Sequence, residues 1–312
     1  MKIQKIIFSC SEAYSPFWNI QSKLWNSMGV EPVCLLYSGP DDWNRAGSIS
    51  KTDMSEDFGH VIEMSTIAGK TASGNGCEDP SNNIPWNVQM NWSKFNHAAS
   101  EPDVTWITGD IDLIPLQKAH FTTQLDNVPD TAYVHLNAGG ISGPRLGIRE
   151  GFSVYGSQRR GLDTGAPGAD LPAHYHVAKG RMFERYTKNL PFEDQVKILM
   201  NGRYGLGPVG GSVPEDQRIS NAYWYYWCAE ENYTSYVLEG DIRRGSVDFR
   251  PFYYSTSNDT ERIDRDTLDG NNYVYTPHHV SHGRIVDVHC HRPYSVQERS
   301  LMELIRLSGL LQ

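Results

Sequence analysis

Two apolar runs separated by an amphipathic segment constrain the fold of this 312-residue chain more than any other feature. The first run, KIIFSC, is followed by PFWNIQSKLWNSMG, whose apolar residues recur at helical spacing until Gly29 ends the pattern. The next run, EPVCLLYSG, has the composition of a second strand. A strand, a helix and a strand in this order predict two parallel strands joined by a right-handed crossover.

Later segments continue this alternation of strands and helices. HVIEM and TAYVHL predict strands, while IPWNVQMNWSKFNHAAS, opened by Pro85, and PLQKAHFTTQLDN predict helices. Between the two helices lies DVTWITGD, in which the residues of both faces are apolar or small. Such a strand is typical of a sheet that helices cover on either side.

The second half of the chain is less regular. Helical stretches between Gly- and Pro-rich loops precede a strand in RIVDVHCHRPYS and a terminal helix in QERSLMELIRLSGLL. We therefore expect one domain over 1–312 of the α/β class, with a mostly parallel sheet flanked by helices and an irregular C-terminal portion.

Composition restricts the partners and the compartment. A net charge of −9 argues against a general nucleic-acid binder, which needs a basic surface. No apolar run is long enough to cross a bilayer, and the opening MKIQKIIFSC is too short for a signal peptide. Five scattered cysteines without C-x-x-C spacing suit reduced thiols, so we expect a cytoplasmic protein. They are Cys10, Cys34, Cys77, Cys228 and Cys290.

The segment TWITGDIDLIPL places two carboxylates, Asp110 and Asp112, at the end of an apolar strand. Residues i and i+2 of an extended chain point the same way, so both would meet beyond the strand's carboxyl end, where open α/β sheets bind ligands. Their mutual repulsion needs an offset, and two carboxylates with open coordination positions suit Mg²⁺ or Mn²⁺ carrying a diphosphate. A bare D-x-D can also be an acidic turn; its place after the strand favours the metal.

Five histidines crowd into fourteen residues near the C-terminus: His278, His279, His282, His289 and His291. We expect His289 or His291 to be a third metal ligand, with His282 a weaker candidate and most of the five at the surface. Imidazole beside two carboxylates favours Mn²⁺ over Mg²⁺. The H-x-H of an amidohydrolase-like barrel is excluded, because that motif belongs on a first strand and here the chain ends soon after it.

Several of these segments together resemble glycosyltransferases of the GT-A fold, in pattern closest to the glycogenin and lipopolysaccharide galactosyltransferase type. FSCSEAY resembles the first strand and donor loop of that family, which implies that Ser9, Cys10 and Ser11 hold the nucleotide and that Tyr14 lies against uracil. GDIDLIPL is similar to its metal motif. The resemblance implies that Asp110 contacts the ribose or the metal.

Two further segments carry the resemblance into the second half. HLNAGGISG resembles the family's asparagine–small–glycine strand, which implies that Asn137, Ala138 and Gly139 line the sugar and acceptor pocket. PEDQRISNAYW is similar to its D-Q-x-x-x-N segment and places Asp216 and Gln217 on matching positions. HCHRPY resembles the late histidine and basic–Pro–aromatic cluster, with Arg292 at the diphosphate.

Two acidic pairs compete for the acceptor side, Glu215–Asp216 and Glu193–Asp194, each at the start of an expected helix. Acids there are favoured by the helix dipole and need no catalytic role. In an inverting enzyme one of them would be the general base; in a retaining enzyme, as the resemblance implies, they would bind donor hydroxyls. Of the basic groups, Lys94 and either Arg292 or Arg284 are candidates to neutralise the diphosphate.

The resemblance, together with the predicted metal site, implies a metal-dependent glycosyltransferase, a hexosyltransferase that moves a sugar from a UDP-linked donor to a hydroxyl of a glycan acceptor. Residues 1–135 would be the nucleotide-binding half and 136–312 the acceptor half with the C-terminal metal and diphosphate segment. A nucleotidyltransferase acting on a sugar phosphate is an alternative, but SCSEAYSPF lacks its glycine-rich basic loop. A second alternative is an inactive nucleotide-sugar-binding protein.

Overall fold

The main sheet of the protein has seven strands in the order β10-β8-β9-β6-β1-β2-β3, and all neighbours are parallel except the two pairs that include β9. The expected α/β class with a mostly parallel sheet is confirmed. The strands are β1 (Lys5–Ser11), β2 (Glu31–Tyr37), β3 (His60–Met64), β6 (Thr105–Gly109), β8 (Ala132–Leu136), β9 (His176–Lys179) and β10 (Asp248–Phe252). The computed structural model describes residues 1–37, 53–67, 71–72, 84–136, 174–201, 229–252, 261–263, 277–290, 294 and 297–311.

The β-α-β unit expected at the start of the chain is confirmed. Strand β1 leads through a short 3₁₀ helix, η1 (Glu12–Phe17), into α1 (Trp18–Ser27), and β2 then pairs with β1 in parallel over its whole length. The chain leaves α1 through Gly29, whose φ of +84° is a left-handed conformation that glycine adopts without strain.

The strand order of the sheet reverses at β1. Successive strands β2 and β3 lie on one side of β1, whereas β6 pairs with its other side. The carboxyl ends of β1 and β6 therefore flank the crevice where open α/β sheets bind ligands. The pairing of β1 with β6 ends where Phe8 lies opposite Gly109, so Ser9 to Ser11, still paired with β2, and Asp110 lie at this same edge.

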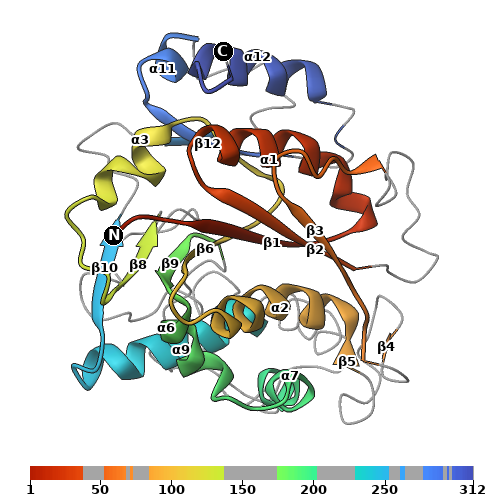
Figure 1. The fold of residues 1–312 in the computed structure, drawn as a ribbon, viewed down its shortest axis with the longest axis vertical. Helices are drawn as coiled ribbons and strands as arrows, with labels where there is room; N and C mark the ends of the chain where they lie inside the picture. Colours follow the sequence, from red (N-terminus) through yellow and green to blue (C-terminus); the bar gives the residue numbers. More distant parts are fainter. Residues whose placement is uncertain are drawn as a thin grey trace, which may run out of the picture.

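Helices cover both faces of the sheet (Figure 1). On one side lie α1, α11 (Pro277–Ser281) and the C-terminal α12 (Glu298–Ser308); on the other lie α2 (Trp86–Ser100), α6 (Gly180–Thr187), α7 (Phe192–Asn201) and α9 (Ala229–Arg243). Alternate residues of β1 supply the two cores. Ile6 and Phe8 pack with the α1 side, and Ile7 packs with the α2 side.

A smaller sheet connects the end of β6 with the C-terminal part of the chain. It has the order β11-β12-β7, where β11 is Glu261–Ile263, β12 is Ile285–His289 and β7 is Leu113–Pro115. Strand β12 runs antiparallel to β7, with His289 opposite Leu113. Two residue pairs, β4 (Thr71–Ala72) and β5 (Ile84–Pro85), form a further short ladder.

Three expectations about secondary structure need correction. The helix expected over PLQKAHFTTQLDN is only α3 (Lys118–Phe121) and a 3₁₀ turn, η4 (Thr123–Leu125), and its first residue, Pro115, ends β7. The strands β10 and β11 were not expected. In LPAHYHVAKGRMFERYTKN, one of the second-half segments expected to contain helical stretches, α6 is such a helix, but β9 precedes it, buried between β6 and β8, and this strand was not expected.

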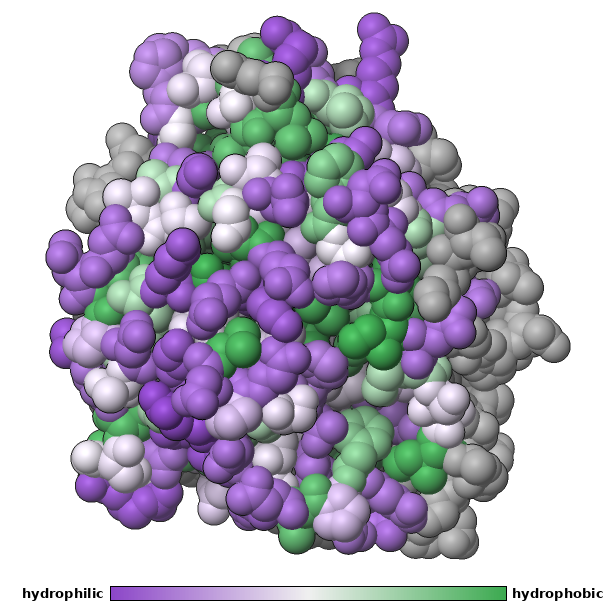
Figure 2. Space-filling model, viewed as in Figure 1, coloured by the Kyte–Doolittle hydropathy of each residue, from purple (hydrophilic) through white to green (hydrophobic). Residues whose placement is uncertain are grey.

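The surface is mainly hydrophilic on the face that Figure 2 shows, with hydrophobic patches between the polar side chains. In the part of the chain that the structure describes, four large apolar side chains are well exposed, and each comes from a different segment: Ile62, Leu190, Tyr236 and Met302. Among the described residues, no helix has both the length and the apolar character needed to span a membrane. Cys10, Cys34 and Cys290 are free thiols, as expected.

Candidate functional site

Asp110 stands at the carboxyl end of β6 between two basic side chains. Lys94 Nζ of α2 donates to Asp110 Oδ1 at 2.8 Å, and His174 Nδ1 lies 3.2 Å from Asp110 Oδ2. Lys94 is almost fully buried, whereas 37% of the Asp110 side chain is exposed. The carboxylate is therefore held in place by its neighbours and can still be reached from solvent.

The electrostatics of this group follow from burial and pairing. Burial alone would raise the pKa of Asp110, but the ion pair with Lys94 and the hydrogen bond from His174 hold that pKa well below its usual value. Burial lowers the pKa of His174, against the raising effect of Asp110. At neutral pH the group thus contains an ionised Asp110 and a neutral His174.

His174 connects Asp110 to a second, deeper ion pair. Arg262 of β11 donates from Nε and Nη2 to the two oxygens of Asp287 on β12, both at 2.8 Å. The same Nη2 lies 3.3 Å from His174 Nε2. Because arginine only donates, Nε2 is an acceptor, and the imidazole proton is on Nδ1, facing Asp110.

The turn that carries the D-x-D motif is fixed by backbone and side-chain contacts. Leu113 N–H donates to the Asp110 carbonyl at 3.0 Å, so the chain turns after β6 and does not stay extended as expected. The buried Gln21 of α1 donates to the carbonyls of Ile111 at 3.0 Å and Leu113 at 2.7 Å. This turn separates the two carboxylates, and Asp110 faces Lys94 and His174 while Asp112 faces β12.

Asp112 meets His289, one of the two late histidines expected at the metal. His289 Nε2 lies 3.7 Å from Asp112 Oδ2, and Cys290 N–H donates to the Asp112 carbonyl at 2.8 Å. Oxygen and nitrogen atoms at this separation can both ligate one ion, since each metal–ligand bond is about 2.0–2.2 Å long. The pair fits two positions of a Mn²⁺ site, whereas both oxygens of Asp110 already have basic partners.

Within the part of the chain that the structure describes, no group of three or more His, Cys, Asp or Glu side chains is placed to hold a metal ion. The weaker candidate, His282, is exposed at the end of α11, and its Nδ1 donates to the His278 carbonyl at 2.9 Å. His278 and His282 also lie ring against ring. These two histidines have the surface role expected for most of the cluster.

The carboxyl end of β1 presents buried polar groups toward the same edge. Ser9 and Ser11 are buried, and among the described residues neither hydroxyl has a hydrogen-bond partner. Unpaired buried hydroxyls are costly, and a polar ligand at this edge would remove that cost. Cys10 points to the opposite face, 3.5 Å from Cys34 Sγ, and Tyr14 is half-buried in η1.

A carboxyl group that the sequence did not single out lies near Lys94. Glu230, in the first turn of α9, is buried, and its Oε2 has no hydrogen-bond partner among the described residues. Burial and the charge of Glu231 raise the pKa of Glu230 well above its usual value, against the lowering effect of Lys94. Its surroundings therefore favour the protonated form of this glutamate.

The structure also describes the acid Asp194 and the late aromatic residue Tyr294. Asp194 is exposed in the first turn of α7 and pairs with Lys197 at 3.6 Å, the arrangement expected for a helix-capping acid. The ring of Tyr294 packs edge-on against Phe17 of η1, with centroids 5.1 Å apart, so the late aromatic lies beside the donor loop. The remaining candidates lie outside the described residues: Asn137, Ala138, Gly139, Glu215, Asp216, Gln217, His291 and Arg292.

Sequence reasoning missed His174, Arg262, Asp287 and Glu230. Of these four residues, only Asp287 could have been found from the local sequence. It stands two residues before His289 on the same strand and therefore on the same face. The other three come from segments whose relation to Asp110 depends on the tertiary structure.

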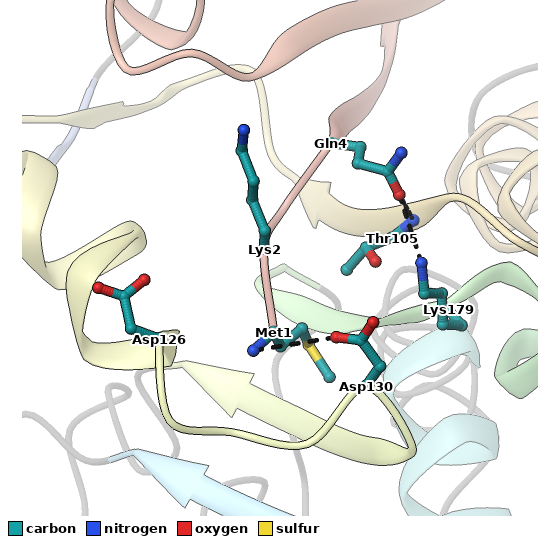
Figure 3. A pocket seen from close by; sticks show the side chains of 7 residues that line it. All are labelled: Met1, Lys2, Gln4, Thr105, Asp126, Asp130 and Lys179. Atoms are coloured by element: carbon teal, nitrogen blue, oxygen red, sulfur yellow. Dashed lines mark hydrogen bonds and ion pairs between the residues drawn. The ribbon is translucent and has the colours of Figure 1, made fainter.

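A cavity of about 540 Å³ lies at the opposite, amino-terminal edge of the sheet, away from these residues (Figure 3). Its polar groups pair with one another: Gln4 Oε1 accepts from Thr105 N at 2.9 Å and from Lys179 Nζ at 3.4 Å. The N-terminal amine donates to the Leu125 carbonyl at 2.8 Å. The cavity is lined by Met1, Lys2, Gln4, Thr105, Asp126, Asp130 and Lys179.

Comparisons with known proteins give only distant similarities. No protein-family model matches the chain, and no curated protein matches it. A structure of the galactosyltransferase LgtC with donor and acceptor sugar analogs aligns at a TM-score of 0.39 and 12% identity, covering 98% of this chain and 95% of that one. The apo structure of the bifunctional glycosyltransferase WbbM aligns at 0.36 and 11% identity, over 92% of this chain and 45% of that one. At this level of agreement neither alignment carries an argument about activity.

Proposed function

We propose that this protein is a metal-dependent glycosyltransferase that moves a hexose from a nucleotide-diphosphate sugar, UDP-linked, to a hydroxyl group of a glycan. The observation that supports it most is the meeting of His289, from the last strand of the chain, with Asp112 beside the Lys94–Asp110 pair. A nitrogen and oxygen pair for a divalent ion thus lies next to a charged group at the binding edge of an α/β sheet.

The nucleotide would lie along the carboxyl ends of β1 and β6. The unpaired hydroxyls of Ser9 and Ser11 supply hydrogen bonds for its polar atoms, and the half-buried ring of Tyr14 supplies a face for the base. Asp110, ionised and accessible, accepts hydrogen bonds from ribose hydroxyls. Its position is set by Lys94 and His174, so the donor meets a carboxylate that is already oriented.

Asp112 and His289 would hold the metal, Mn²⁺ by the mixture of oxygen and nitrogen ligands. When bound, such an ion supplies Lewis-acid stabilisation of the charge that develops on the departing diphosphate. Lys94 contributes positive potential close to the same group. Arg292 is a further candidate for this role by its place in the sequence.

The acceptor side rests on the family resemblance of the sequence. Asn137, Ala138 and Gly139 would line the sugar and acceptor pocket, with Asp216 and Gln217 at the donor sugar. The exposed Asp194, paired with Lys197, is the weaker acidic candidate, because helix capping accounts for its position.

The test is hydrolysis of UDP-sugars with and without Mn²⁺ by the wild-type protein and by Asp112→Ala. Asp126→Ala is the matched control, since it removes an exposed carboxylate at the opposite edge of the sheet. We expect turnover that requires Mn²⁺, is lost in Asp112→Ala and is retained in Asp126→Ala. Turnover that ignores both the metal and Asp112 would refute the mechanism. Nucleotide-sugar binding with no turnover on any donor and acceptor would point to a binding protein.

The donor can be identified by thermal shift with a panel of nucleotide sugars and Mn²⁺, because a ligand that binds only the folded state raises its stability. A nucleotidyltransferase would instead release pyrophosphate from a nucleoside triphosphate and a sugar phosphate, so both assays belong in the same screen.

A further inference from the structure

Five side chains from five segments of the chain form one continuous hydrogen-bonded array. Along its contacts it runs Lys94, Asp110, His174, Arg262 and Asp287, and successive polar atoms are 2.8, 3.2, 3.3 and 2.8 Å apart. Two carboxylates, two cations and one neutral imidazole give the array no net charge. Balanced and hydrogen-bonded in this way, charges can be buried at an acceptable cost.

Both ends of the array, Lys94 and Asp287, are buried, and the array reaches solvent at Asp110. Asp287 is fully buried and 9% of the Arg262 side chain is exposed, whereas Asp110 is partly open to solvent. A change at the Asp287 end can therefore reach the solvent-facing carboxylate through His174. Arg262 itself lies in β11, away from the carboxyl end of β6, and touches Asp110 through this histidine.

The backbone next to His174 shows that the histidine is held in place at some cost. Tyr175 has a φ of +62°, a left-handed conformation that is rare and destabilising for a bulky residue. Its buried ring packs against Phe121 at a centroid distance of 5.0 Å. This conformation sends the Tyr175 side chain into the core and leaves His174 between Asp110 and Arg262.

We propose that Arg262 is a positioning residue for the donor site, which acts through His174 to fix the orientation of the Asp110 carboxylate. Asp287 holds the Arg262 guanidinium by two parallel hydrogen bonds, and the third contact of that guanidinium makes His174 Nε2 an acceptor. The Nδ1 proton is then committed to Asp110. The inference rests on the proposed function, in which Asp110 receives the nucleotide.

The geometry distinguishes this role from simple attachment of β11 to β12. A bidentate pair between Arg262 and Asp287 would be complete without a third partner. The contact with His174 adds nothing to the joining of these two strands but determines the tautomer of a ring that touches Asp110. Loss of Arg262 should therefore alter the donor site beyond any loss of stability.

The test compares Arg262→Met with Arg185→Met, a matched control on the far face of the sheet. Arg185 also pairs with one aspartate, Asp241, at 2.8 Å, and the two side chains are 14% and 15% exposed. Stability is measured by urea unfolding, and the affinity for UDP with Mn²⁺ is measured by calorimetry. We expect both variants to lose stability, but only Arg262→Met to weaken UDP binding, by roughly tenfold, the loss of one charge-assisted hydrogen bond.

Variants of His174 provide a test that survives if Arg262→Met fails to fold. Gln keeps one N–H donor and one acceptor, so His174→Gln should bind UDP within about threefold of wild type, whereas His174→Leu should match Arg262→Met. Combining Arg262→Met with His174→Leu should add little to either change, because both interrupt the same connection. Unchanged UDP affinity in Arg262→Met, or fully additive effects in the double variant, would overturn the proposal.

A readout without nucleotide separates this inference from the proposed function. In ¹⁵N-histidine NMR spectra we expect wild-type His174 to be the neutral tautomer with its proton on Nδ1, and Arg262→Met to lose that single tautomer. If the wild type binds no UDP but the tautomer still depends on Arg262, the proposed function fails and the positioning of Asp110 stands. If His174 has the same tautomer in the wild type and in Arg262→Met, the proposed positioning role of Arg262 is wrong, whatever the protein binds.

Discussion

Replacing Asp287 by Asn should expose how strongly the C-terminal strands are fixed to the end of β6. Asp287 is fully buried and accepts two hydrogen bonds of 2.8 Å from Arg262, whose own side chain is almost buried. The substitution leaves the guanidinium charge without a counter-charge in the interior. Breaking a buried pair in this way costs about 3–5 kcal/mol, and the remaining amide oxygen places the expected loss near 3 kcal/mol.

For a chain of this length a loss of that size corresponds to a fall in melting temperature of roughly 6 °C, at about 2 °C per kcal/mol. Urea unfolding followed by tryptophan fluorescence measures the change in free energy directly, provided that the m-value is unchanged. The control is Asp248→Asn. Its partner Arg250 Nε is as close, at 2.6 Å, but the two side chains are 54% and 40% exposed, so we expect no measurable change. Equal effects of the two substitutions would refute the reasoning from burial.

Three further predictions concern the site and its supports. Glu230→Gln should gain stability over wild type as pH rises above 4.5. The reason is that a glutamate with a raised folded-state pKa loses its stabilising contribution as pH rises through that pKa. A difference in melting temperature between the two proteins that stays constant from pH 4 to pH 8 would contradict this. His289→Ala should abolish the Mn²⁺-induced thermal shift while His282→Ala, at an exposed histidine, keeps it; the reverse order would place the metal elsewhere. Gly180→Ala should lower the free energy of unfolding, measured in urea, by about 1–3 kcal/mol. The added Cβ would meet the backbone carbonyl oxygens of Glu101 and Ala98, which cannot move aside. An unchanged free energy of unfolding would show that α6 shifts freely on α2.

Local sequence patterns were sufficient for the elements that neighbouring residues encode. The β-α-β start, the helix α2 and the buried strand β6 each follow from the periodicity of a single segment, and all three were predicted correctly. The same approach failed for β9. This strand has only four residues, His176–Lys179, and it is recognisable because β6 and β8 pair with it on both sides, which no local pattern records.

The candidate site shows the same division. The position of Asp110 and Asp112 after an apolar strand predicted that they lie at the carboxyl end of β6. The turn closed by Leu113 and held by Gln21 decided that the two carboxylates face different partners. His289 and His291 were equivalent from the sequence, since residues two apart on a strand share a face. The antiparallel register of β12 on β7 brought His289 to Asp112.

The array through His174 and Arg262 was determined by the tertiary structure alone. Its members are separated by tens to more than a hundred residues, and each is an ordinary polar side chain in its own segment. Helices and strands that have a clear apolar periodicity are specified largely by near neighbours, so those elements can be predicted from composition and spacing. A chain specifies a charge network only when the packing of the whole domain removes water from between its members, and that packing depends on all segments together.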